Sequence, residues 1–113
     1  MLPIEQILMW QQLFTLLSNL PTDSIPDLKV SLDRSIKFFE SHIIPQDLDN
    51  LPDPIAGKMR SYLTESHRLL RLLPIDLTFI AAARNPATIE QRRQSYQYKL
   101  DLLLQYCQAI IKS

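Results

Sequence analysis

Few side chains in this sequence are spaced for catalysis or metal binding. The only histidines are His42 and His67, and neither belongs to an HxxxH or ExxH pair. The only cysteine, Cys107, falls on an apolar helix face with no activating group near it in sequence, so we expect a buried, unreactive thiol. One cysteine excludes an internal disulfide framework, and one glycine leaves no glycine-rich phosphate loop. We therefore expect no metal, no cofactor and no nucleophilic catalysis.

One enzyme class stays open as the alternative. Small helical bundles of the chorismate-mutase type bind a dicarboxylate between their helices with buried Arg, Lys, Glu and Gln. Arg93 occupies an apolar seam position of its helix, and Glu65 and Gln97 lie on helices that could face one another. Because an arginine near a helix end more often extends to water, our first expectation is a protein without enzymatic activity or a small-molecule substrate.

Arginines of the second half form the strongest chemical pattern. Arg84, Arg92 and Arg93 gather where the third predicted helix turns into the fourth. Arg68 and Arg71 lie one turn apart on the third helix. Since guanidinium groups hold carboxylates in a bidentate fork, this pattern predicts docking onto an acidic protein partner.

Charge is distributed unevenly along the chain. The 12 Lys+Arg and 12 Asp+Glu cancel, which argues against a nucleic-acid binder that covers phosphates. Residues 1–53 hold 3 basic and 8 acidic side chains (net −5), and residues 54–113 hold 9 and 4 (net +5). Two interpretations remain: acidic helices packed beside basic ones, or a dipolar molecule with a basic face for an acidic partner.

Helical spacing of the apolar residues predicts the fold that must position these groups. A chain of 113 residues is one domain. Apolar side chains recur at steps of 3 and 4 between proline-marked linkers, and strand-like alternation is not evident. We predict an all-α, single-domain, antiparallel four-helix bundle with helices at 3–19, 25–43, 54–84 and 87–112.

Prolines and polar residues mark the helix boundaries. Ser24 is the predicted N-cap of the second helix. Asp53 followed by Pro54 has the form of an N-cap and first helical residue for the third helix. For the fourth helix two starts compete: a capping box of Thr88 and Gln91, and Asn85 followed by Pro86. Pro74 lies inside the third helix, where it removes a hydrogen bond to residue 70, so the helix is either kinked or split. We predict a kink, because Leu73 and Leu77 keep their spacing across it.

Some apolar residues lie outside the helix faces formed by steps of 3 and 4, and they could bind a partner protein or a second copy of the chain. A wide buried stripe accounts for most of them, but Phe38 and Tyr62 are the best candidates for a partner interface or a homodimer. The long helices should project beyond the short pair and leave one end uncovered. Trp10 and the tyrosines Tyr96, Tyr98 and Tyr106 are interpreted as core packing rather than base stacking.

Targeting and membrane signals are not evident in the sequence. The N-terminus lacks a basic region and a small-residue cleavage site. No stretch of about 18 uncharged apolar residues occurs, so we expect no membrane insertion and a cytoplasmic location.

Four motifs in the second half carry a family resemblance. They are SYLTE at 61–65, RLL-IDL-F at 71–79, AARNPAT at 82–88 and QYCQAI at 105–110, with FFESHIIP at 38–45 in the first half. Together they resemble the heterocyst frequency control protein PatD family of cyanobacteria. The resemblance implies a non-enzymatic regulator that binds the tubulin-like division GTPase FtsZ, modulates its assembly and so influences cell division and, in filamentous hosts, heterocyst frequency. No binding residue comes from the family, so the site candidates remain Arg84, Arg92, Arg93, Arg68, Arg71, Phe38 and Tyr62.

Overall fold

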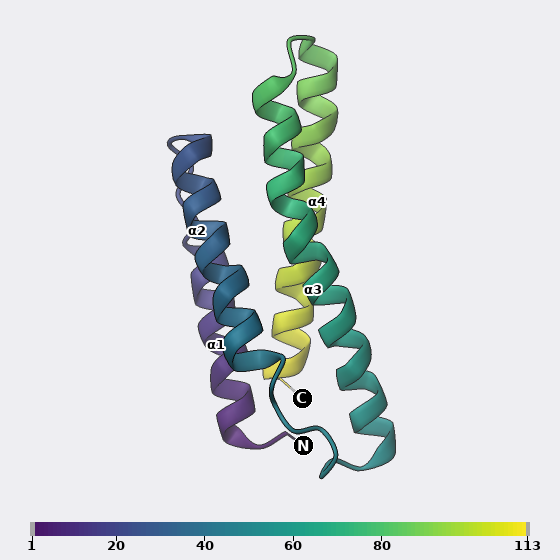
Figure 1. The fold of residues 1–113 in the computed structure, drawn as a ribbon. Helices are drawn as coiled ribbons and strands as arrows, with labels where there is room; N and C mark the ends of the chain where they lie inside the picture. The colour runs from purple at the N-terminus through teal and green to yellow at the C-terminus, as the bar shows by residue number, and fades with distance from the viewer. Residues whose placement is uncertain (1, 113) are drawn as a thin grey trace.

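The computed structural model describes residues 2–112 and contains only helices in that range. The elements, in chain order, are α1 (Ile4–Ser18), α2 (Ile25–Phe38), the π-helix η1 (Phe39–Ile43), α3 (Asp53–Ala82) and α4 (Pro86–Ile111). They run up, down, up and down, with the chain ends at the same end of the bundle (Figure 1). The predicted all-α antiparallel four-helix bundle is confirmed.

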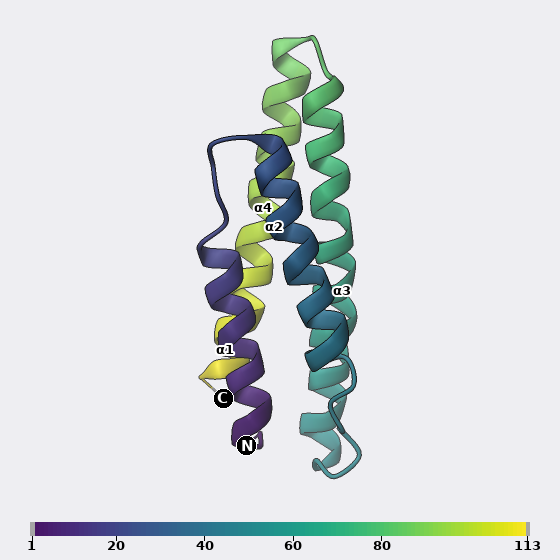
Figure 2. The same ribbon diagram turned by 60° about the vertical axis from the view of Figure 1, so that its left-hand side comes forward.

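Neighbouring helices close a ring around one core. α1 packs on α2 and α4, and α3 packs on α2 and α4, which leaves α1 and α3 diagonal to each other. α3 and α4 have 30 and 26 residues, whereas α1 and α2 have 15 and 14. The long pair therefore extends beyond the short pair at the end opposite the termini (Figures 1 and 2), as the helix lengths predicted.

Side-chain caps mark the starts of two of the four α-helices. The Ser24 hydroxyl accepts a hydrogen bond from the Asp27 N–H at 3.2 Å, and Asn85 Oδ1 accepts one from the Ala87 N–H at 2.8 Å. Pro86 is thus the first residue of α4, and the Asn85-Pro86 start is correct. The expected Asp53 cap of α3 is wrong: Pro52 occupies that position without a side-chain hydrogen bond, and Asp53 is already helical.

The end of the second predicted helix is not α-helical. From Phe39 to Ile43 the backbone widens into a π-helix, in which the Ile44 N–H donates to the Phe39 carbonyl at 3.0 Å. One π turn separates Phe39 from Ile43, and both are fully buried. Phe39 and Ile43 therefore both belong to the buried face of this turn.

α3 runs as one helix through Pro74. Its axis changes direction along its length, and its upper part runs beside α4 (Figure 1). The Thr78 hydroxyl donates to the Pro74 carbonyl at 3.0 Å and accepts from Lys29 Nζ at 2.8 Å, so α2 supports the turn after the proline. The prediction of one helix rather than two is confirmed.

Seam residues form the core as their spacing predicted. Trp10 and Phe39 are fully buried, with ring centroids 5.9 Å apart and an interplanar angle of 81°, an edge-to-face pair. Cys107 is also fully buried, and this burial raises its thiol pKa to about 12. The expected buried, unreactive thiol is therefore what the fold provides.

Core packing predicts a sharp contrast between two leucines. Leu73 is fully buried, whereas Leu8 is 49% exposed. Leu73→Ala should lower the free energy of unfolding by about 2–5 kcal/mol, because it removes buried methyl groups and leaves a cavity. Leu8→Ala, the matched control, should change it by no more than about 0.5 kcal/mol in urea denaturation. Equal effects would contradict the assigned core.

Cys107 predicts loss of stability in alkali. In the unfolded chain the thiol ionises near its ordinary pKa of 9.0, whereas the fold keeps it protonated up to about 12. The contribution of the protonated thiol to the free energy of unfolding is complete below pH 9. It is lost as the pH rises towards 12, because the unfolded state then binds fewer protons than the folded state. Denaturation from pH 8 to 11 should show a steeper fall for wild type than for Cys107→Ala. Parallel slopes would contradict the burial of this thiol.

Candidate functional site

Two of the candidate arginines are engaged along the middle of α3. Arg68 Nη2 lies 2.9 Å from Glu65 Oε2 on the same helix, and this contact raises the pKa of the Arg68 guanidinium. Arg71 Nη1 lies 3.5 Å from Glu40 Oε2, which is also 3.0 Å from His67 Nε2. Both arginines are exposed, but their charges are matched by carboxylates of this chain.

The other three arginines lie on the part of the α3–α4 hairpin that extends past the short helices. We define this projecting end as residues 79–93, whose charged side chains are Arg84, Arg92, Arg93 and Glu90, a net charge of +2. Arg84 and Arg93 are exposed and make no ion pair with any residue that the structure describes. Their guanidinium groups are available to an external carboxylate.

Arg92 is held in place by two contacts. Its guanidinium carbon lies 4.2 Å from the centroid of the Phe79 ring, a cation–π distance, and its Nη1 lies 3.6 Å from Asp76 Oδ1. Phe79 itself is 48% exposed. The projecting end therefore presents an ordered aromatic–guanidinium pair to solvent.

A buried carboxylate joins α3 to α4 at the base of the projecting end. Asp76 is only 2% exposed. Its Oδ2 accepts hydrogen bonds from Lys99 Nζ at 2.6 Å and from Ser95 Oγ at 3.3 Å, and Lys99 also contacts the Ser95 oxygen at 2.6 Å. With Arg92, these residues form the network that we call the Asp76 network. It fixes how the two long helices lie against each other just below the arginines.

Sequence reasoning missed the Asp76 network. The residues IDL at 75–77 are part of one motif behind the family resemblance, but the sequence analysis assigned no chemical role to Asp76. The sequence did contain an indication of its role. Asp76 lies 7 residues after Leu69 and 3 after Leu73, so it shares their apolar helix face, and it is the only acidic residue between residues 66 and 89. An isolated carboxylate on such a face needs a buried cationic partner. Lys99 and Ser95, one turn apart on α4, were the available partners.

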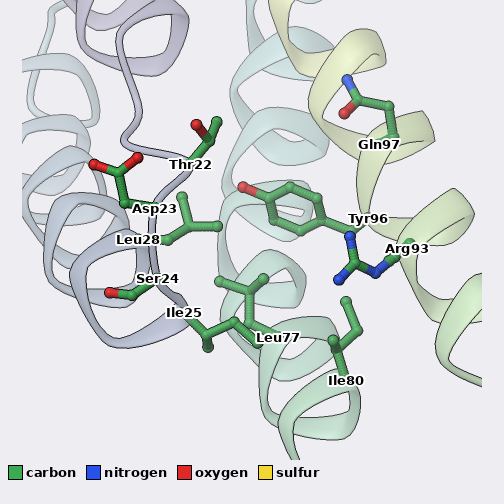
Figure 3. Close-up of a pocket in the computed structure, with 10 residues that line it drawn as sticks. All are labelled: Thr22, Asp23, Ser24, Ile25, Leu28, Leu77, Ile80, Arg93, Tyr96 and Gln97. Carbon is green, nitrogen blue, oxygen red and sulfur yellow. The ribbon is translucent and has the colours of Figure 1, made fainter.

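A groove opens beside the projecting end, between the α1–α2 linker and α4 (Figure 3). Its volume is about 330 Å³, and its lining residues are Thr22, Asp23, Ser24, Ile25, Leu28, Leu77, Ile80, Arg93, Tyr96 and Gln97. Most of the lining from α2 and α3 is apolar, and burial raises the pKa of the Tyr96 phenol to about 12. Tyr96 therefore remains a neutral hydroxyl in this groove at any physiological pH.

Phe38 and Tyr62 lie far from the projecting end. Phe38 is half-buried near the end of α2, with its ring centroid 4.9 Å from that of His42. Tyr62 is half-buried in the lower part of α3, where its ring centroid lies 5.4 Å from that of Tyr106. The structure thus does not bring these two residues together with the arginines of the projecting end into one surface.

The residues considered for a mutase-type site are only partly assembled. Arg93 and Gln97 line the same groove, but Glu65 lies on the surface and pairs with Arg68. Within residues 2–112, no three His, Cys, Asp or Glu side chains are grouped to hold a metal ion. Over the same range, no helix is both long enough and apolar enough to cross a bilayer.

The Asp76 network predicts a double-mutant signature. Asp76→Leu should lower the free energy of unfolding by about 3–5 kcal/mol, because it leaves the Lys99 ammonium largely buried without its carboxylate. Asp76→Leu combined with Lys99→Met should recover most of that loss, since no uncompensated charge remains. Chemical denaturation of the three proteins measures both effects.

The matched control for this pair is Asp33→Leu. Asp33 is exposed and pairs with Lys37 one turn away, at 2.9 Å, so its loss should cost less than about 1 kcal/mol. A double variant as unstable as Asp76→Leu alone would show that the carboxylate is not there to neutralise Lys99.

The comparisons with known proteins assign no family. No protein-family model matches this sequence, and neither a curated protein nor a solved structure shows significant similarity to it.

Proposed function

We propose that this protein is a non-enzymatic adaptor of the PatD type that acts in the cytoplasm. It binds FtsZ, modulates FtsZ assembly and thereby influences cell division and, in filamentous hosts, heterocyst frequency. The resemblance of residues 61–110 supplies the identity of the partner. The observation that supports docking is the projecting end, where Arg84 and Arg93 have no carboxylate of their own among residues 2–112.

Docking would use a surface that is ordered before the partner arrives. Arg92 is fixed on the Phe79 ring and tethered to Asp76, so less side-chain freedom is lost on binding. Arg84 and Arg93 supply charge that steers an acidic partner, while the half-exposed Phe79 supplies apolar area. This combination of arginine and aromatic anchors is typical of the residues that dominate interface energies.

A ligand-binding function of the chorismate-mutase type is the second candidate. One observation favours it: Arg93, Gln97 and the Tyr96 hydroxyl line one groove of about 330 Å³. Incubation of the pure protein with chorismate, followed by absorbance, tests the enzyme directly. Turnover that Arg93→Ala abolishes would replace the adaptor proposal, and absence of turnover would remove this alternative.

Co-sedimentation with assembled FtsZ tests the adaptor proposal. Wild type should sediment with FtsZ, and Arg84→Glu/Arg93→Glu should bind at least tenfold more weakly, a loss of about 1.4 kcal/mol or more. These positions are preferable to Arg92, because a glutamate at 92 would lie beside the Asp76 carboxylate. Both are exposed, so the variant should keep the helical content and melting temperature of wild type.

Arg34→Glu/Lys112→Glu is the matched control. It makes the same change in net charge at exposed positions outside the projecting end. This control should bind FtsZ within about twofold of wild type. Equal weakening of both variants would show a non-specific charge effect, and a wild-type chain that does not sediment with FtsZ would refute the proposed function.

A further inference from the structure

α1 lacks the charged outer surface that a solvent-facing helix normally carries. Seven residues of Ile4–Ser18 are exposed, and only one of them, Glu5, is charged. Ile4 and Leu8 are 70% and 49% exposed. α2 has nearly the same length, but four of its six exposed residues are charged. The outer surface of α1 is therefore different from that of the helix beside it.

The uncharged exposed residues lie on the side of α1 opposite the buried Trp10. They recur at steps of 4, 3 and 4, which places them on one helix face: Ile4, Leu8, Gln11 and Thr15. Leu16 marks the edge of α1 that borders α2, because it lines a surface hollow with Arg34. Ile4 and Gln11 lie toward the other edge, which borders α4 (Figure 2).

The edge of α4 toward α1 is also nearly uncharged. Ser95 and Lys99, which contact Asp76, mark the edge of α4 toward α3. The residues on the opposite edge, at steps of 3, 4 and 3, are Asp101, Leu104, Gln108 and Ile111. Asp101 is the only charged side chain among them, and its Oδ1 accepts a hydrogen bond from Gln97 Nε2 at 2.8 Å. We call these four residues, together with the four of α1, the α1–α4 face.

The composition of the α1–α4 face is that of the centre of a protein interface. Charged residues are depleted at such centres, and aliphatic side chains there provide area to bury. Seven of the eight residues carry no charge, and the half-buried Leu104 and Ile111 lie beside the more exposed Ile4 and Leu8. The face therefore fits an uncharged protein surface, unlike the projecting end, which fits an acidic one.

A second copy of this chain supplies such a surface. In a dimer with a two-fold axis, each partner uses the same residues. The amide of a glutamine both donates and accepts hydrogen bonds, so Gln11 and Gln108 can pair with the amides of an identical face. Carboxylates and ammonium groups cannot pair with their own kind in this way. The chain also has a formal net charge of zero, so two copies approach without long-range repulsion.

The area of the α1–α4 face is sufficient for a stable dimer. The accessible surface of the molecule is 6986 Å². The face is one of the four sides of the bundle, and it extends over the length of α1, about 22 Å of the 50 Å of the whole molecule (Figure 1). This share of the surface is about 900 Å², and each partner of a standard-size interface buries about 800 Å².

We infer that this protein is a homodimer in which two copies pack through their α1–α4 faces about a two-fold axis. Ile4 and Leu8, which are exposed in a single chain, become buried in the dimer. Dimerisation does not depend on the proposed function, because the composition, amide chemistry and area of the face favour it without FtsZ.

The dimer leaves both projecting ends accessible. Residues 79–93 lie at the end of the long helices that α1 does not reach, away from the α1–α4 face (Figure 1). Where the proposed function also holds, one dimer carries two docking surfaces and can bind an FtsZ polymer at two subunits, which raises its apparent affinity.

Sedimentation velocity of the full chain from about 1 to about 300 μM tests the dimer. Wild type should change from the mass of one chain, 13.2 kDa, to that of two as the concentration rises. Leu8→Glu should weaken association about tenfold or more, because each copy then buries a carboxylate against the other. The Leu8 side chain is half-exposed, so this variant should keep the helical content of dilute wild type.

Val30→Glu is the matched control, since Val30 is 55% exposed on α2, outside the α1–α4 face. It should dimerise within about twofold of wild type. Hydrogen exchange of wild type should be slower at high than at low concentration for residues 4–15 and 101–111, and it should be unchanged for residues 79–93.

Stability provides a second readout. The urea midpoint of wild type should rise with chain concentration, since dimerisation stabilises the folded state, whereas that of Leu8→Ala should rise less. In the dilute monomer Leu8 is exposed, so Leu8→Ala remains there the neutral control for Leu73→Ala.

The possible failures are distinguishable. A wild-type chain that remains at 13.2 kDa at the highest concentration would overturn the homodimer. Equal weakening by Leu8→Glu and Val30→Glu, or a Leu8→Glu chain that dimerises like wild type, would overturn the assigned face. A dimer that does not bind FtsZ would refute only the proposed function, and FtsZ binding by a wild type that stays monomeric would refute only the dimer.

Discussion

The buried carboxylate of Asp76 is the constraint on which the upper half of the molecule depends. An ionised carboxylate is costly to bury alone, and here Lys99, Ser95 and Arg92 from α4 surround it. The same contacts join the two helices where α1 no longer reaches them, and Lys29 of α2 supports the neighbouring turn through its hydrogen bond to Thr78. Arg92 connects this internal network to the exposed Phe79 ring, which links packing inside the hairpin to the surface outside it.

Unequal helix lengths leave the end of that hairpin beyond the short helices. At this level Leu77 and Ile80 of α3 are buried, while Arg93 of α4 beside them is exposed. Because α1 ends at Ser18, apolar seam residues and an unpaired guanidinium meet in one groove. The opposite charges of the two chain halves meet where Glu40 pairs with Arg71, which supports complementary packing. Arg84 and Arg93 have no acidic partner among residues 2–112.

The sequence predicted features that depend on local spacing or local chemistry. Steps of 3 and 4 identified the α3 core face that includes Leu73, and α3 continued through Pro74. Ser24 capped its helix as expected, and of the two starts left open for α4 the structure has Asn85-Pro86. Features that depend on long-range packing were missed. The π turn at Phe39 and the position of Asp76 against Lys99 follow from the way two helices meet, and neither follows from the preferences of a single segment. Arg84 and Arg92 were grouped correctly because a tight helix turn is local, whereas Phe38 and Tyr62 were separated from them by the fold.

Hydrogen exchange of this chain with and without FtsZ tests the central claim most directly, because it reports protection along the whole backbone at once. If the projecting end forms the docking surface, FtsZ should slow exchange at residues 79–93 and leave residues 54–62 and 105–110 unchanged. Protection confined to residues 54–62 and 105–110, the end that contains Tyr62, would contradict the account.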